Sequence, residues 1–268
     1  MKYVAFLDVL GFKKRLSKLS QYGSERFISS LSSLLYKVWE EKGFQDSKEI
    51  SGYIVSDSII VYTLNDTPHA LINLIDYIIE VCKRAFREES ILFRCGVAKG
   101  SFNHLQSHSF DNLRKGLIVG QAYVDAYLLE DQAKVSAIIL DKTTAEDVNE
   151  HTAFPMDQIK CKDGEEHSII KWGDVDFLLQ DDNLKKFVKL AKEANWIPHY
   201  YNTLYFFLSK GNNEKKQKQV FDNIIEIIKS GNSGQHYREI NAFIENAFSS
   251  DIERHFKDML LKYIRGKI

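Results

Sequence analysis

Two periods of apolar and polar residues alternate along this chain, and each change of period marks an expected element. The apolar run from Tyr3 to Leu7 predicts a short buried strand over 2–8. From 13 to 42 the apolar residues recur at helical spacing, with a break expected near Gly23. Residues 49–64 are two β-rich runs joined at 56–58, which predicts a hairpin.

The middle of the chain continues this alternation of strand and helix. Thr67 and Pro68 are an N-cap residue and a first-turn proline, so we expect a helix from there to about residue 88. Further strands are expected over 91–102 and 136–141, with a helix carrying QAYVDAYLLEDQA between them. The order β-α-β-β-α-β predicts an α+β fold with the ferredoxin-like split arrangement and additions.

The end of the chain differs in pattern, because helical periodicity without strand-like alternation continues from about residue 181. We therefore expect an α+β domain over 1–181 and a helical C-terminal extension over 182–268. Inside the first domain, the polar stretch from Asn103 to Asp111 is interpreted as a loop or insertion. Its histidines, His104 and His108, are expected to be solvent-exposed.

Composition narrows the class of protein. The chain has 268 residues, of which 44% are hydrophobic, so it can bury a full core. A net charge of −1 and a pI near 6.7 predict neither a nucleic-acid-binding nor a membrane surface. No apolar run reaches the roughly 18 residues of a spanning helix, and no signal peptide is expected. Cys82, Cys95 and Cys161 are predicted to be reduced, buried thiols, so we expect a cytoplasmic protein without a zinc site.

The candidate chemistry begins at Asp8, which directly follows the first apolar run. Desolvating a lone carboxylate is costly, so Asp8 needs a partner. It could be the N-cap of the next helix or a ligand of a metal ion. Asp57 lies at the predicted hairpin tip, and in such a sheet the first strand lies beside the hairpin, so the two acids can meet. Oxygen ligands without a Cys/His cluster favour magnesium or manganese, although hairpin-tip aspartate is also common turn chemistry.

Four segments, FLDVLGF, the Asp-bearing hairpin, FRCGVAKG and GQAYVDAYLLE, follow in the order and spacing of the class III nucleotidyl cyclases, which this chain resembles. The resemblance implies a ferredoxin-like catalytic domain in which two manganese or magnesium ions are held by Asp8, Asp57 and the backbone carbonyl of Val9. It also implies that backbone amides at the mouth of the next helix cradle the triphosphate, namely those of Leu10, Gly11 and Phe12. Such a cradle is physically sensible, because helix N-termini attract anions.

Three positions depart from the purine cyclases. Tyr53 stands where those enzymes carry a base-reading lysine, and Val124 and Leu128 stand where they carry an asparagine and an arginine. With these departures, and with WIPHYYN at 196–202, the chain resembles the pyrimidine cyclases of bacterial antiphage defence, the Pycsar group. That resemblance implies that Tyr53 and Arg94 lie in the base pocket.

The resemblance implies a uridylate cyclase that makes a second messenger for antiphage defence. Its reaction is in-line attack of the ribose 3′-oxygen of UTP on the α-phosphorus, giving 3′,5′-cyclic UMP and pyrophosphate. The divalent ions would lower the pKa of the hydroxyl and neutralise the phosphates. A homodimer with a shared site is expected. The alternatives are a cytidylate cyclase making cyclic CMP and a nucleotide-binding module without turnover.

Overall fold

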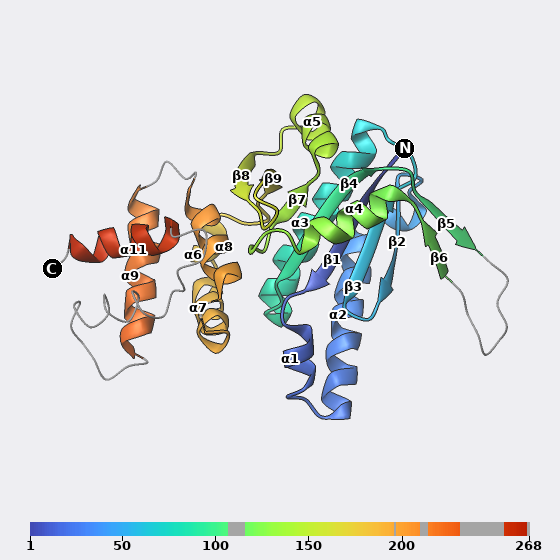
Figure 1. Ribbon diagram of the computed structural model, residues 1–268. Helices are drawn as coiled ribbons and strands as arrows, with labels where there is room; N and C mark the ends of the chain where they lie inside the picture. The colour runs from blue at the N-terminus through green and yellow to red at the C-terminus, as the bar shows by residue number, and fades with distance from the viewer. Residues whose placement is uncertain (107–115, 196, 210–213, 231–254, 267–268) are drawn as a thin grey trace. The chain divides into compact units, whose positions relative to one another are not determined.

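The computed structural model describes residues 1–106, 116–195, 197–209, 214–230 and 255–266 (Figure 1). The predictions that concerned His108, Asp111 and Trp196 lie outside these residues. The chain divides into two compact units. The first unit comprises Met1–Ala85, Ile91–Ala133 and Ala137–Trp172, and the second comprises Phe86–Ser90, Lys134–Ser136 and Gly173–Ile268.

A seven-stranded sheet forms the centre of the first unit among its described residues, in the order β2-β3-β1-β4-β7-β9-β8. Its strands are β1 (Lys2–Val9), β2 (Ile50–Val55), β3 (Ser58–Thr63), β4 (Phe93–Gly100), β7 (Ile138–Leu140), β8 (Met156–Lys160) and β9 (Glu166–Ile170). β1 lies between β3 and β4 and is antiparallel to both, and β4 is parallel to β7. The first four strands therefore have the predicted ferredoxin-like arrangement, which is confirmed.

Helices cover both faces of this sheet (Figure 1). The helical elements of the first unit are α1 (Phe12–Leu16), α2 (Gln21–Glu41), the 3-10 turn η1 (Phe44–Asp46), α3 (Pro68–Glu89), α4 (Gln121–Glu130) and α5 (Lys142–His151). Figure 1 shows α4 on one face and α2 and α3 on the other. α4 approaches the sheet closely at Gly96, where an added Cβ would lie 2.1 Å from the carbonyl oxygen of Ala126.

The structure refines two expectations about local structure. The first helical segment breaks at 17–20 and not at Gly23, because the Ser20 side chain accepts a hydrogen bond from the Gly23 amide and caps α2 there. The stretch after residue 102 was interpreted as a loop or insertion, and its described part begins with a strand. It contains a second sheet, formed by β5 (Asn103–Gln106) and β6 (Gly116–Val119), which pair antiparallel.

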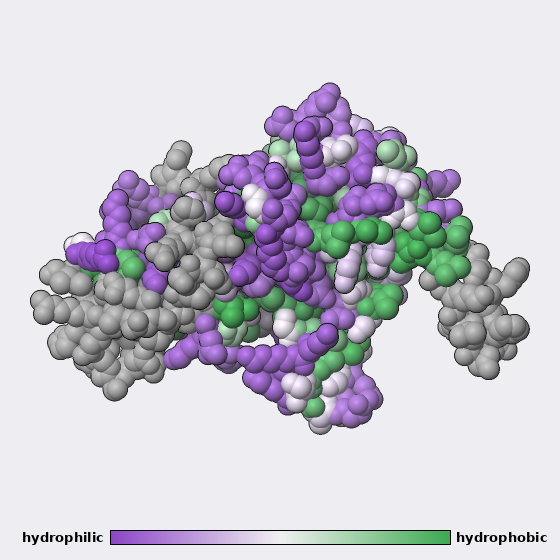
Figure 2. Space-filling model, viewed as in Figure 1, coloured by the Kyte–Doolittle hydropathy of each residue, from purple (hydrophilic) through white to green (hydrophobic). Residues whose placement is uncertain are grey.

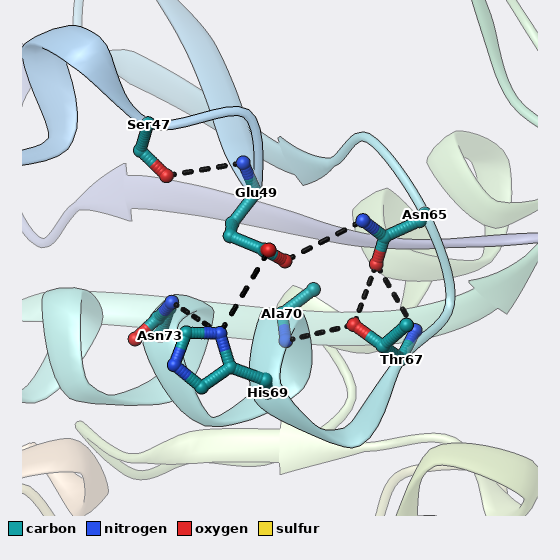
Figure 3. A network of polar contacts seen from close by, with 7 residues as sticks. All are labelled: Ser47, Glu49, Asn65, Thr67, His69, Ala70 and Asn73. Atoms are coloured by element: carbon teal, nitrogen blue, oxygen red, sulfur yellow. Dashed lines mark hydrogen bonds and ion pairs between the residues drawn. The ribbon is translucent and has the colours of Figure 1, made fainter.

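The start of α3 agrees with the N-cap predicted from Thr67 and Pro68. The Thr67 hydroxyl accepts a hydrogen bond from the Ala70 amide at 3.3 Å and itself donates to Asn65 Oδ1 at 2.7 Å (Figure 3). Asn65 Nδ2 in turn donates to a carboxyl oxygen of Glu49, just before β2. This network joins the helix start to the two strands of the hairpin, which fixes the position of β2 and its side chains.

The second unit contains only helices among its described elements, as the periodicity predicted. These are α6 (Val175–Leu179), α7 (Asn183–Glu193), α8 (Pro198–Ser209), α9 (Glu214–Ser230) and α11 (His255–Arg265). Phe86 packs on Phe177 and Phe187 in its core.

All three cysteines of the chain are free and buried, as expected. Among the described helices, none combines the length and apolarity needed to cross a membrane.

Candidate active site

Asp8 and Asp57 lie at the same end of the central sheet. Asp8 is near the end of β1, directly opposite Ser58 of β3 and Arg94 of β4. Asp57 precedes Ser58 in the two-residue turn of the hairpin. Burial raises the pKa of the Asp8 carboxyl, and the nearby charge of Asp57 raises it further, while Arg94 opposes both effects. The fold therefore brings together two carboxyl groups that repel each other when both are ionised.

Arg94 is the partner of Asp8 in this structure. Its Nη2 lies 2.6 Å from Asp8 Oδ2, its Nε lies 2.6 Å from Glu130 Oε1, and its Nη1 lies 3.1 Å from Asp131 Oδ1. The N-cap interpretation of Asp8 was wrong, because the N-cap of α1 is Gly11. The guanidinium that the resemblance assigns to the base pocket binds three carboxyl groups in this structure.

Glu130 is a site residue that the sequence analysis did not single out. It ends α4 and is 4% exposed, which is unusual for a glutamate. Burial raises its pKa to about 7, even though the Arg94 charge lowers it. The signal available in the sequence was a glutamate at the end of an otherwise apolar helix segment, YLLE. Lys162, from the loop after β8, completes the cluster by pairing with Asp131 at 2.7 Å.

The protein itself would supply only some of the ligands of a divalent ion at this site. Within the described part of the chain, no three His, Cys, Asp or Glu side chains form a group that could bind a metal. Asp8 and Asp57 supply two hard oxygen ligand groups, and the Val9 carbonyl is next in sequence to Asp8. This donor set fits magnesium or manganese, which commonly take one or two carboxylates and complete their shell with water and substrate phosphates.

The backbone after Asp8 matches the expected phosphate cradle only in part. The Leu10 amide donates to the Leu92 carbonyl oxygen at 2.8 Å, so that N–H is already used in the structure. Gly11 adopts φ 77°, a left-handed conformation that glycine accepts without strain. The amides of Gly11 and Phe12 belong to the first turn of α1, where N–H groups have no acceptor within the helix.

Tyr53 lies on the same face of the sheet as Asp8. Across the strands, Tyr53 is opposite Ile60, which is opposite Phe6, two residues before Asp8 on β1. The Tyr53 hydroxyl is buried and has no hydrogen-bond partner in the described residues. Burial raises the pKa of this phenol, so it stays protonated and can donate. The ring stacks on His104, with centroids 5.2 Å apart.

Hydrophobic side chains gather on the surface of α4 and of the β5–β6 hairpin, as Figure 2 shows. On α4, Val124 and Leu128 are 45% and 52% exposed. Four more exposed apolar or aromatic residues belong to this surface: Leu105, Leu117, Val119 and Tyr127. We call these six residues the α4/β5–β6 surface. An apolar surface of this kind is typical of an interface with another protein.

Comparison with solved structures identifies the fold. No model of a known protein family and no curated protein matches the chain. Among solved structures, a double mutant of the guanylyl cyclase domain of the RhoGC fusion protein from the aquatic fungus Blastocladiella emersonii is similar, with a TM-score of 0.51, 14% identity, and coverage of 63% of this chain and 93% of that one.

Two further structures have a TM-score of 0.50 and 15% identity, and each covers 63% of this chain. One is the guanylate cyclase domain of RhGC from Catenaria anguillulae in complex with GTP, matched over 93% of its length. The other is the catalytic core of a rhodopsin-guanylyl cyclase with converted specificity, in complex with ATPαS, matched over 94%. The chain therefore has the fold of a class III cyclase catalytic domain, as the sequence predicted.

Proposed function

We propose that this chain is a nucleotidyl cyclase that converts a pyrimidine nucleoside triphosphate, with UTP favoured, into its 3′,5′-cyclic monophosphate and pyrophosphate. The observation that carries the proposal is the Asp8–Asp57 carboxyl pair at the end of the central sheet, within a class III cyclase fold. Similar solved structures are named as guanylyl cyclases, and two of them hold GTP or ATPαS. Their names support cyclase chemistry on a nucleoside triphosphate.

Asp8 and Asp57, with the carbonyl of Val9, would hold two magnesium or manganese ions. Bound there, such ions acidify a ribose hydroxyl and neutralise phosphate charge. The protein's own part is positioning. Arg94 fixes the Asp8 carboxyl by a 2.6 Å ion pair, and Glu130 holds Arg94 from α4. In this proposal Arg94 is a positioning residue, because its guanidinium is already bound to carboxyl groups.

The preference for a pyrimidine rests on Tyr53. A side chain of this size, on the same face as Asp8, leaves less room for a two-ring base than a slim lysine would. Its hydroxyl has no hydrogen-bond partner in the described residues and suits a carbonyl acceptor. Uracil offers two such acceptors, whereas cytosine presents an amino donor at C4. From the sequence, the Arg94 guanidinium was also expected in the base pocket. Because Arg94 is bound to carboxyl groups, the preference rests on the Tyr53 hydroxyl alone.

The assembly that we propose is a homodimer formed through the α4/β5–β6 surface. Val124 and Leu128, which stand where purine cyclases carry an asparagine and an arginine, belong to that surface. A second copy would cover these exposed apolar side chains, which favours association. The role in antiphage defence and the cytoplasmic location rest on the sequence resemblance to the Pycsar group.

The same two positions favour a second candidate, a nucleotide-binding module without turnover, because neither Val124 nor Leu128 can orient a ribose or stabilise charge. A product assay separates the candidates. The chain is incubated with UTP, CTP, ATP or GTP and manganese, and the products are resolved by chromatography against cyclic-nucleotide standards. We expect cyclic UMP as the main product. Binding without any cyclic product would favour the second candidate, and a main product of cyclic CMP would overturn only the choice of uracil.

A further inference from the structure

We infer that His104, on the β5–β6 hairpin, is a second base-specificity residue that acts together with Tyr53. The inference rests on the proposed cyclase function and deepens it by naming a residue that reads the substrate base. His104 was expected from the sequence to be an exposed loop residue. In the structure it is half-buried on β5 and directly contacts the candidate base-reading tyrosine.

The contact between the two side chains is a stack. The rings of Tyr53 and His104 are 5.2 Å apart between centroids and inclined by 24°. The two residues come from different sheets, since Tyr53 is on edge strand β2 and His104 on β5. The Tyr53 hydroxyl is buried without a hydrogen-bond partner among the described residues. A donor kept away from water binds a carbonyl acceptor more strongly, because water does not compete for it.

The surroundings of His104 also orient its imidazole. Its Nδ1 lies 3.5 Å from the Tyr62 hydroxyl. The Tyr62 ring in turn packs on Phe102 at 4.5 Å, and the Lys2 ammonium lies 5.6 Å from its centroid. In this inference the Tyr62 phenol is the donor to Nδ1, so that the imidazole carries its proton on Nε2. The pair then presents two donors, the Tyr53 hydroxyl and His104 Nε2–H.

Two donors match the chemistry of uracil, whose edge offers carbonyl oxygens. Cytosine places an amino donor at one of these positions, and adenine offers no carbonyl. A site that presents buried donors discriminates against a base that leaves them unpaired. His104 therefore adds to base choice and to substrate affinity, while the ion-binding end of the site at Asp8 and Asp57 is left unchanged.

The test measures KM and kcat for UTP, CTP and ATP in the unmutated chain and in four variants. His104→Ala removes the ring, and His104→Phe keeps a ring for stacking but removes the donor. His104→Gln restores a donor without the ring, and Tyr62→Phe removes the hydroxyl that orients Nδ1. Asn103→Ala is the matched control, because Asn103 is an exposed neighbour on the same strand. Thermal melting shows that each variant is folded.

We expect His104→Ala and His104→Phe to lower kcat/KM for UTP about tenfold, mainly through KM, as loss of one hydrogen bond to the substrate implies. Values for ATP should change little, so the preference for UTP shrinks, and His104→Gln should recover part of it. An equal loss for all three triphosphates, no loss, or a lower KM for all of them would overturn the inference while the cyclase proposal stands. If the unmutated chain forms no cyclic nucleotide, both fail together.

Discussion

At the scale of single residues, the site is governed by Arg94 and the carboxyl groups around it. Arg94 binds Asp8, Glu130 and Asp131, so one cation faces three carboxyl groups, and Lys162 supplies a second cation at Asp131. Glu130 is the most buried of the three. Its pKa of about 7 means that burial destabilises the ionised carboxylate by more than the Arg94 charge stabilises it. The cluster is therefore sensitive to pH.

The pH dependence of stability tests this description of Glu130. Because its pKa rises from 4.5 to about 7 on folding, the folded chain binds more protons than the unfolded chain between these values. The free energy of unfolding should therefore fall as pH rises from about 4.5 to 7, by at most about 3 kcal/mol from this group. Glu130→Gln should remove that part of the fall in urea unfolding measured at several pH values. Glu146→Gln is the control, because Glu146 is exposed. A pH profile of Glu130→Gln identical to that of the unmutated chain would contradict a raised pKa of Glu130 in the folded chain.

At the scale of elements, the contact of α4 with the sheet positions the site, because α4 carries Glu130 at its end. The backbone of α4 lies close to β4 at a position where the strand has no side chain. Gly96 of β4 meets this condition, since a Cβ there would lie 2.1 Å from the Ala126 oxygen and 2.9 Å from the Glu130 nitrogen. Backbone atoms cannot move aside as a side-chain tip can, so the helix itself would have to shift.

Gly96→Ala should therefore displace α4 and lower the free energy of unfolding by about 1–3 kcal/mol, as overpacking typically does. Cyclase activity should fall with it, because Glu130 would no longer hold Arg94. The matched control is Gly23→Ala in the first turn of α2, where the nearest atoms to an added Cβ are 3.4 Å away. Denaturant unfolding of both variants is the measurement. Equal stability of the Gly96 and Gly23 variants would show that α4 is not pressed against β4 at this point.

The sequence predicts the elements of this chain better than the partners of its residues. Hydrophobic periodicity gives the strands and helices, and the N-cap at Thr67 is visible locally. The pairing of Asp8 with Arg94 depends on strand register, which joins residues 86 positions apart and leaves no local signal. The same holds for His104, whose partner Tyr53 belongs to another sheet. The buried state of Glu130 also depends on which face of α4 meets the sheet.

At the scale of the whole molecule, the α4/β5–β6 surface predicts association of two copies. Val124→Glu and Leu128→Glu place charges on this surface and should convert a dimer to a monomer. Burying an unpaired charge raises the free energy of the dimer by more than the remaining apolar contact lowers it. Light scattering after size-exclusion chromatography gives the molar mass. Tyr22→Glu is the control, since Tyr22 is 70% exposed on α2. A monomeric unmutated chain, or variants that remain dimeric, would contradict the proposed interface.

The most direct test of the proposed chemistry compares cyclic-nucleotide formation by Asp8→Asn, Asp57→Asn and Ser58→Ala with that of the unmutated chain, over a series of manganese concentrations. The two aspartate variants keep the side-chain volume but remove a ligand charge. Ser58→Ala alters the residue that pairs with Asp8 and follows Asp57, without removing a charge. We expect each aspartate variant to lose at least about a hundredfold in kcat, with normal folding, while Ser58→Ala stays active. Retention of activity by either folded aspartate variant would contradict the two-carboxylate site.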